Sequence, residues 1–106
     1  EKKLSAGISN YPSLVEAGKN IVSSESVNTS QQTSSSRGGI GFSKDYVFLV
    51  IAKSASVTDL ASIFMALKAD YAMNLDGGAT SAMYFNGAYT YGPNRELANA
   101  IIFKKK

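Results

Sequence analysis

The sequence NLDGGATSAM, residues 74–83, holds the side chains with the clearest chemical potential in this chain. Its carboxylate, Asp76, follows an apolar run at 71–75 that indicates a strand, and open sheets bind ligands beyond the carboxyl ends of strands that follow a crossover helix. Gly77 and Gly78 would let a ligand approach the backbone, where N–H groups can bind an anion or a sugar oxygen. The same pattern is also typical of a plain Asp-Gly-Gly turn, in which the Asp side chain bonds nearby backbone groups.

The composition narrows the chemistry that such a site can perform. The 106 residues include no Cys and no His, which excludes a thiol nucleophile, Cys-ligated metal sites, a Ser-His-Asp triad and the usual imidazole metal sites. Acid and base work therefore falls to carboxylates, Lys or Tyr. We expect no cofactor. A divalent cation at Asp76 stays open, although one carboxylate is few for a hard metal ion.

The net charge of +3 and the pI of 9.2 come from the ends of the chain rather than from its body. Residues 4–103 carry six Lys or Arg and seven Asp or Glu, a net charge of −1. A duplex-binding surface clusters basic side chains on one face, so we expect no nucleic-acid partner and assign the terminal lysines to solubility. No apolar run approaches the ~18 residues of a membrane span, so no span is expected. The start at Glu1 rather than Met suggests a piece of something longer.

Local patterns predict a mixed α/β fold, dominated by strands, around these residues. The run at 46–52 (YVFLVIA) is continuously apolar and β-rich, which predicts a strand buried on both faces. A helix connects it to the strand at 71–75, so we expect one right-handed βαβ crossover inside a mainly antiparallel sheet. Gly18 and Asn86-Gly87 predict tight hairpin turns. Further strands are expected at 4–9, 13–15, 20–23, 80–85, 88–91 and 98–103.

The main helix is predicted over residues 57–69. Leu60 begins a set of apolar residues at helical spacing, which places one apolar stripe against the sheet. Ser56 with Asp59 resembles a capping box, and Thr58 is a competing N-cap.

Segment 23–36 (SSESVNTSQQTSSS) contains 7 Ser in 14 residues and almost nothing apolar. It cannot bury enough apolar surface to order itself, so we expect a flexible loop. Its length fits a spacer or a lid over an active site and does not choose between them. The length of 106 residues allows a single domain, 1–106.

Four motifs in chain order resemble the phosphodiester glycosidase family, which is related to the enzyme that uncovers mannose 6-phosphate by removing N-acetylglucosamine from a phosphodiester. Residues 74–83 are similar to its Asn-Leu-Asp-Gly-Gly-Gly-Ser signature. The other matches are RGGIG at 37–41, TDLA at 58–61 and RELANA at 95–100, with a similar hairpin, PSLVEAGK, at 12–19; the resemblance covers about 8–103. The chain departs from the pattern at 38–39 and 79–80, and it lacks strands that members carry before the hairpin. The resemblance therefore implies the C-terminal part of a larger domain, whose other strands either come from a second chain or segment or are missing from this piece.

The resemblance implies hydrolysis of a glycosyl phosphodiester. This reaction passes through an oxocarbenium-like state, which calls for a carboxylate near the anomeric carbon and a cation on the phosphate. Asp76 is the expected catalytic carboxylate, as nucleophile or stabiliser, and Arg37 is the expected phosphate clamp. A phosphate leaving group needs little protonation, so the lack of His is no obstacle. The substrate-binding residues that we expect are Asn74, Gly77, Gly78, Thr80, Ser81 and Arg95.

Each role has a structural alternative that the sequence leaves open. Arg37 could form only a structural pair with Asp76. Asn74 could orient the carboxylate or satisfy a strand end, and Arg95 could be a solvated loop residue. Tyr89 and Tyr91 could stack on a sugar or belong to the core.

The sequence supports two classes of function. The first is a glycosidase that acts on sugar phosphodiesters of bacterial cell-surface or exported glycans, located outside the cell or in the cell envelope. The second is a non-catalytic glycan-binding or assembly module that kept the scaffold. Survival of Arg37 and Asp76 favours catalysis, whereas the changes at 38–39 and 79–80 and the missing strands favour the module.

Overall fold

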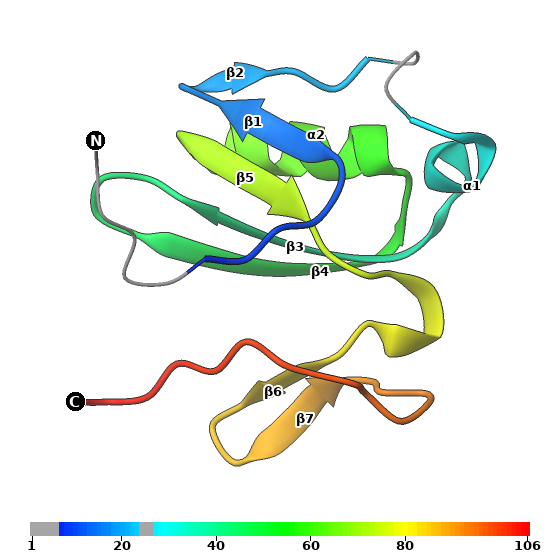
Figure 1. Cartoon of the computed structure of the whole chain (residues 1–106). Coiled ribbons are helices and arrows are strands. Elements are labelled where there is room, and N and C mark those ends of the chain that lie inside the picture. The colour runs from blue at the N-terminus through cyan, green and yellow to red at the C-terminus, as the bar shows by residue number, and fades with distance from the viewer. Residues whose placement is uncertain (1–6, 24–26) are drawn as a thin grey trace.

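The computed structural model of the chain describes residues 7–23 and 27–106. A five-stranded sheet carries the long helix, and a two-stranded hairpin lies below it in Figure 1. The predominance of strands confirms the mixed α/β class expected from the sequence. The elements in chain order are β1 Ser13–Glu16, β2 Lys19–Asn20, α1 Thr29–Gln32, β3 Ser35–Phe42, β4 Val47–Ala55, α2 Val57–Ala66, β5 Tyr71–Asn74, the 3₁₀ turn η1 Gly78–Thr80, β6 Met83–Phe85 and β7 Ala88–Tyr91.

The strand order of the larger sheet is β2-β1-β5-β3-β4. Strand β3 is antiparallel to both β4 and β5, so these two strands run parallel to each other with β3 between them. Helix α2 connects β4 to β5, which confirms the predicted crossover in a mainly antiparallel sheet. Parallel strands end at the same end of a sheet. The chain therefore leaves β4 and β5 at one end, where Asp76 follows β5.

The core lies between α2 and one face of the sheet. Leu60 and Phe64 of α2 are fully buried and belong to one apolar cluster with Leu14 of β1. The Phe64 ring lies directly over two glycines of β3. A Cβ atom on Gly39 would lie 2.6 Å from a ring carbon of Phe64, and one on Gly41 would lie 2.9 Å from another. Glycine leaves the space that this ring occupies.

Helix α2 begins where the sequence predicts and ends three residues earlier. Ser56 is its N-cap: the Asp59 N–H donates to Ser56 Oγ over 3.0 Å, and the Ser56 N–H donates to Asp59 Oδ2 over 2.9 Å. The capping box is therefore confirmed, with Ser56 rather than Thr58 as the cap. The helix stops because Lys68 adopts a φ of 60°. Leu67, which helical spacing from Leu60 would place on the buried stripe, is the C-cap of the helix and is 40% exposed.

Replacing Ser56 by Ala is expected to lower the free energy of unfolding by about 1 kcal/mol, the usual cost of losing a serine N-cap. The change leaves one N–H of the first helical turn without its side-chain acceptor. Urea unfolding of the wild-type and S56A chains at pH 7 measures the difference. Equal stability of the two chains would show that the cap contributes nothing.

The capping box also makes part of the stability depend on pH. The hydrogen bonds from Ser56, the backbone bond first, lower the pKa of Asp59 below its ordinary value of 3.8. A carboxyl with a lower pKa in the folded state stabilises the fold above its unfolded-state pKa, and this contribution is lost as the pH falls through the folded-state pKa. We expect the stability difference between wild type and D59N to be present at pH 7 and to shrink as the pH falls below 3.8. A difference that does not change with pH would contradict this linkage.

Strand β4 is the edge strand of the sheet and is not buried on both faces, which corrects the expectation for the run at 46–52. Helix α2 covers only the face that carries Phe48, so Val47 and Leu49 on the other face are 57% and 42% exposed. Phe42 pairs with Val47 on one side and with Tyr71 on the other, so these side chains share that face. We call Phe42, Val47, Leu49 and Tyr71 the open sheet face.

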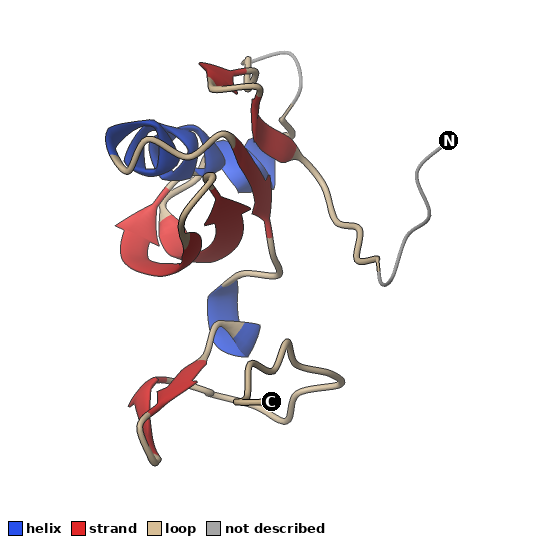
Figure 2. Cartoon of the chain, turned by 90° about the vertical axis from the view of Figure 1, so that its left-hand side faces the viewer, coloured by secondary structure: helices blue, strands red, loops and turns tan. Residues whose placement is uncertain are grey.

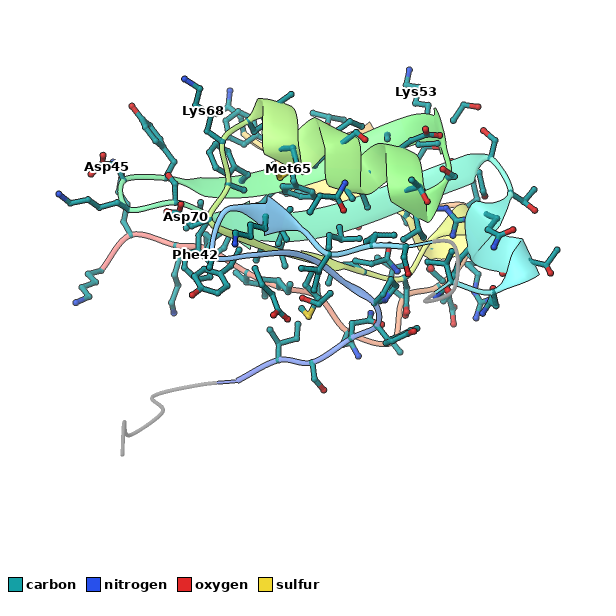
Figure 3. The ribbon with its side chains drawn as sticks, turned by 90° about the horizontal axis from the view of Figure 1, so that it is seen from above. Phe42, Asp45, Lys53, Met65, Lys68 and Asp70 are labelled. Carbon is teal, nitrogen blue, oxygen red and sulfur yellow. The ribbon has the colours of Figure 1, made fainter. Side chains whose placement is uncertain are left out.

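The two ends of the sheet differ in their charged residues (Figure 3). Asp45, Lys68 and Asp70 lie near Phe42 at one end, and Lys53 lies at the opposite end, where β4 finishes. Asp45 and Asp70 are exposed surface charges. Because Asp76 follows the carboxyl end of β5, these two carboxylates lie at the end of the sheet remote from it.

The hairpin predictions hold at both turns. Gly18, between β1 and β2, has a φ of 76°, and Asn86-Gly87, between β6 and β7, has φ values of 53° and 88°. The strand expected at 80–85 begins later, at Met83, because residues before it form the 3₁₀ turn η1.

Segment 23–36 is not a loop throughout, and the prediction is wrong for two parts of it. Residues 24–26 lie outside the described residues. Beyond them, Asn28 and Gln31 form a reciprocal capping box that begins helix α1, and Ser35 already belongs to β3. Hydrogen bonds of polar side chains hold this helical turn, and no residue of α1 is buried. A prediction based on apolar content therefore misses it.

Two further strand predictions are also wrong for the residues that the structure describes. Residues 7–9 and 98–103 form no strand, and the remaining part of the strand expected at 4–9 lies outside the described residues. Ile102 and Phe103 are 78% and 58% exposed. An apolar, β-rich segment becomes a strand only where another strand pairs with it, and neither described sheet includes residues 98–103.

Candidate functional site

The loop after β5 places Asp76 where the sequence predicts, beyond the carboxyl end of the strand that follows the crossover helix. The Leu75 N–H donates to the carbonyl of Gly38 over 2.8 Å, which holds the start of the loop against β3. The chain then turns through η1, which lies between the sheet and the β6–β7 hairpin in Figure 2. Gly78 has a φ of 65°, a conformation that favours glycine. The Asp76 side chain is exposed at the start of this turn.

Arg37 is buried, and its guanidinium binds three backbone carbonyls. Nε donates to Ala55 O over 3.2 Å, and Nη2 donates to Ser30 O over 2.7 Å and to Thr33 O over 2.8 Å. The side chain therefore joins α1 to the end of β4. It bonds these carbonyls rather than the Asp76 carboxylate, so the structural ion pair that the sequence left open is not what holds it.

Arg37 also lies beside the Asp76 loop. A Cβ atom on Gly77 would lie 3.5 Å from Arg37 Nη1 and 2.8 Å from the carbonyl oxygen of Ser36. A side chain at position 77 would therefore collide with β3, which explains why glycine is needed there. The close approach brings a fixed positive charge next to the residue that follows Asp76.

Asn74 fastens the chain before β1 to the end of β5. Its backbone N–H donates to Pro12 O, and its Nδ2 donates to Tyr11 O, each over 3.1 Å. Of the two roles that the sequence left open, these contacts favour the strand end, since the amide bonds backbone rather than Asp76. The hydrogen bond to the Asp76 carboxylate comes instead from Asn10 Nδ2, 3.4 Å from Oδ1.

Asn10 is a site residue that the sequence reasoning missed. It lies two residues before Pro12, directly ahead of the first hairpin. Nothing in its residue type or spacing relates it to Asp76, because the contact joins residues 66 positions apart.

The two hydroxyls expected to bind substrate differ in their surroundings. Thr80 Oγ1 donates to Gly77 O over 2.8 Å and so closes the turn. Ser81 is 2% exposed, and neither its Oγ nor Asn74 Oδ1 has a hydrogen-bond partner among the described residues.

Arg95 is exposed and lies in a loop tied to η1, because the Asn94 N–H donates to Ala79 O over 3.1 Å. A shallow hollow of about 590 Å³ there is lined by Tyr89, Pro93, Arg95, Glu96 and Leu97.

The tyrosines of β7 are not core residues of the sheet. Tyr89 is 57% exposed and packs edge-on against Tyr84, with ring centroids 5.1 Å apart. Tyr91 is half-buried, and its hydroxyl hydrogen-bonds Ser36 Oγ, which joins β7 to β3. A second hollow, of about 440 Å³, lies between β4, α2 and this hairpin, and neither hollow is lined by Asp76.

The described residues contain neither a metal-binding cluster nor a membrane-spanning helix. Within 7–23 and 27–106, no three His, Cys, Asp or Glu side chains gather closely enough to hold a metal ion. In the described part of the chain, no helix is long and apolar enough to cross a membrane.

Known proteins resemble this chain at the levels of sequence family and fold. A family model described as phosphodiester glycosidase matches residues 1–104. The fold is similar to a crystal structure of a hypothetical protein from Synechocystis, with a TM-score of 0.62 and 22% identity over 74% of this chain and 17% of that one. It is also similar to the catalytic domain of zebrafish N-acetylglucosamine-1-phosphodiester alpha-N-acetylglucosaminidase, auto-inhibited by its pro-peptide, with a TM-score of 0.63 and 18% identity over 79% of this chain and 34% of that one. No curated protein matches the sequence significantly. The chain thus spans about a sixth and a third of the solved relatives.

Proposed function

This chain belongs to the phosphodiester glycosidase family, and from that membership we propose that it is a hydrolase that cleaves a sugar from a glycosyl phosphodiester. One observation supports the proposal most strongly: the exposed Asp76 carboxylate and the Arg37 guanidinium come to the same loop from different strands. Both groups suit the charges that develop when the bond between a sugar and a phosphate breaks.

In the proposed reaction, the bond between the anomeric carbon and the phosphate oxygen breaks. The phosphate leaves with the bonding electrons as a phosphomonoester, and water supplies the hydroxyl of the released sugar. Asp76 acts at the anomeric carbon, as nucleophile or as stabiliser of the oxocarbenium-like state. Arg37 is held rigidly by three carbonyls and offers Nη1 and its charge to the phosphate. The N–H groups of Gly77 and Gly78 and the Arg95 side chain bind the phosphate and sugar oxygens.

The substrate and setting are part of the same proposal. We place the enzyme on bacterial cell-surface or exported glycans, outside the cell or in the cell envelope, and the family's chemistry and the lack of Cys are consistent with that setting. A second chain or a further segment completes the domain. The open sheet face and the small share of the solved relatives that this chain spans support that partner.

A non-catalytic glycan-binding module is the second candidate. The carbonyl bonds of Arg37 favour it, because they occupy Nε and Nη2 and so weaken the phosphate clamp that catalysis would need, whereas binding of a sugar does not require that clamp. The shallow hollow beside Tyr89 and Arg95 would then hold a sugar without cleaving it.

One assay separates the two candidates. The full chain is incubated with the methyl phosphodiester of N-acetylglucosamine 1-phosphate and, in parallel, with methyl N-acetylglucosaminide, which lacks the phosphate. Released sugar and phosphomonoester are quantified, and binding of each compound is measured by calorimetry. Release from the phosphodiester alone supports the hydrolase. Binding without release supports the module, and neither binding nor release overturns both.

A further inference from the structure

Asp76 is an exposed carboxylate on a short turn, and its side chain has a contact from outside that turn. That contact comes from Asn10, also exposed, whose Nδ2 donates to Asp76 Oδ1 over 3.4 Å. Asn10 belongs to none of the sequence motifs and comes from the chain before β1, whereas Asp76 follows β5.

The Asn10 side chain is itself oriented by a local hydrogen bond. The Tyr11 N–H donates to Asn10 Oδ1 over 2.7 Å. Because the carboxamide is planar, holding Oδ1 on this N–H determines the direction in which Nδ2 donates. That direction is toward Asp76.

The segment that carries Asn10 is fastened to the strand that carries Asp76. Asn74, the last residue of β5, donates from its N–H to Pro12 O and from its Nδ2 to Tyr11 O. Pro12 is buried, and Ser13 pairs with Met73 in the sheet. The position of Asn10 relative to Asp76 is therefore determined by the end of β5 rather than by a free terminus.

We propose that Asn10 is a positioning residue for Asp76: it holds Oδ1 of the carboxylate and leaves Oδ2 to meet the anomeric carbon. The inference rests on the proposed function, since it assigns Asn10 to the same reaction. A group that orients a catalytic carboxylate raises the rate of the bound complex more than it raises substrate affinity.

The kinetic test compares N10A and N10D with N20A. Asn20 is a matched control, because its Oδ1 accepts the Val22 N–H in the same kind of local bond, at the end of the β1–β2 hairpin. We expect N10A to lower kcat about 10-fold with KM changed less than about twofold. N10D should lower kcat further, because it places a second carboxylate beside Asp76. N20A should match wild type. Equal kcat in N10A and wild type, or an equal loss in N20A, would overturn the proposal.

A second measurement does not depend on activity or on the folding of the Asn10 variants. In ¹⁵N-labelled protein, the side-chain amide resonances of Asn10 are compared between wild type and D76A, with those of Asn20 as reference. We expect the Asn10 resonances to move and those of Asn20 to stay. Unmoved Asn10 resonances would overturn the contact. If wild type releases no sugar while the Asn10 resonances move, the proposed function fails and the contact stands.

Discussion

Replacing Asp76 by Asn is expected to lower the release of sugar from a glycosyl phosphodiester by roughly 10³-fold. The amide keeps the size of the side chain and removes the negative charge that, in the proposed reaction, stabilises the developing oxocarbenium ion. The free energy of unfolding should change by less than about 0.5 kcal/mol, as for other exposed positions. The side chain is exposed, and its hydrogen bond to Asn10 spans 3.4 Å. Initial rates and urea unfolding of D76N measure the two quantities.

Asp45→Asn is the matched control for that experiment. Asp45 is also an exposed carboxylate, and it lies at the end of the sheet remote from Asp76. The D45N chain should release sugar at the wild-type rate. An unaltered rate in D76N would remove this carboxylate from the reaction. Equal losses in D76N and D45N would point to a general effect of charge.

Replacing Phe64 by Ala is expected to lower the free energy of unfolding by about 3–5 kcal/mol, the range for truncating a buried aromatic side chain. Phe64 is 0% exposed and is the largest fully buried side chain of the described core. Its ring fills the space over Gly39 and Gly41, where the sheet offers no side chain that could close the cavity. Since the free energy of unfolding of a small domain is about 5–15 kcal/mol in total, the F64A chain should be close to unfolding.

Met65→Ala on the same helix provides the comparison for this loss. Met65 is 37% exposed on α2 (Figure 3), and it directly follows Phe64 in the sequence. We expect M65A to cost about 1–2 kcal/mol, less than F64A, because Met65 keeps 37% of its surface in water whereas Phe64 keeps none. Guanidinium unfolding curves of both variants give the two values. A cost below 1 kcal/mol for F64A would show that the helix does not pack on β3 as described.

Local patterns predicted the parts of the fold that local interactions decide. The capping box at Ser56, the glycine turn at Gly18 and the Asn86-Gly87 hairpin each depend on residues within four positions, and each is present. The crossover followed from one helix placed between two strands. The position of Asp76 beyond the carboxyl end of β5 followed from the same connection.

The features that the sequence did not predict depend on partners far along the chain. The apolar run of β4 resembles a central strand, and only the complete strand order makes it an edge with Leu49 exposed. Residues 98–103 have a strand's composition and pair with none of the described strands. Arg37 bonds the carbonyl of Ala55, and Asn10 bonds Asp76. In both cases the residue types give no sign that the two segments meet.

The hydrogen bonds from Arg37 to backbone carbonyls make the stability of helix α1 depend on the end of β4. Helix α1 buries none of its residues, so apolar packing alone would let it open independently. Its carbonyls at Ser30 and Thr33 share one guanidinium with Ala55 O, and the same side chain lies beside Gly77. When α1 opens, the buried Arg37 guanidinium loses two of its hydrogen-bond acceptors, Ser30 O and Thr33 O. Leaving a buried charged donor unpaired costs more free energy than leaving a neutral one unpaired. Opening of α1 is therefore coupled to the end of β4, because the same Arg37 guanidinium that binds Ser30 O and Thr33 O also binds Ala55 O.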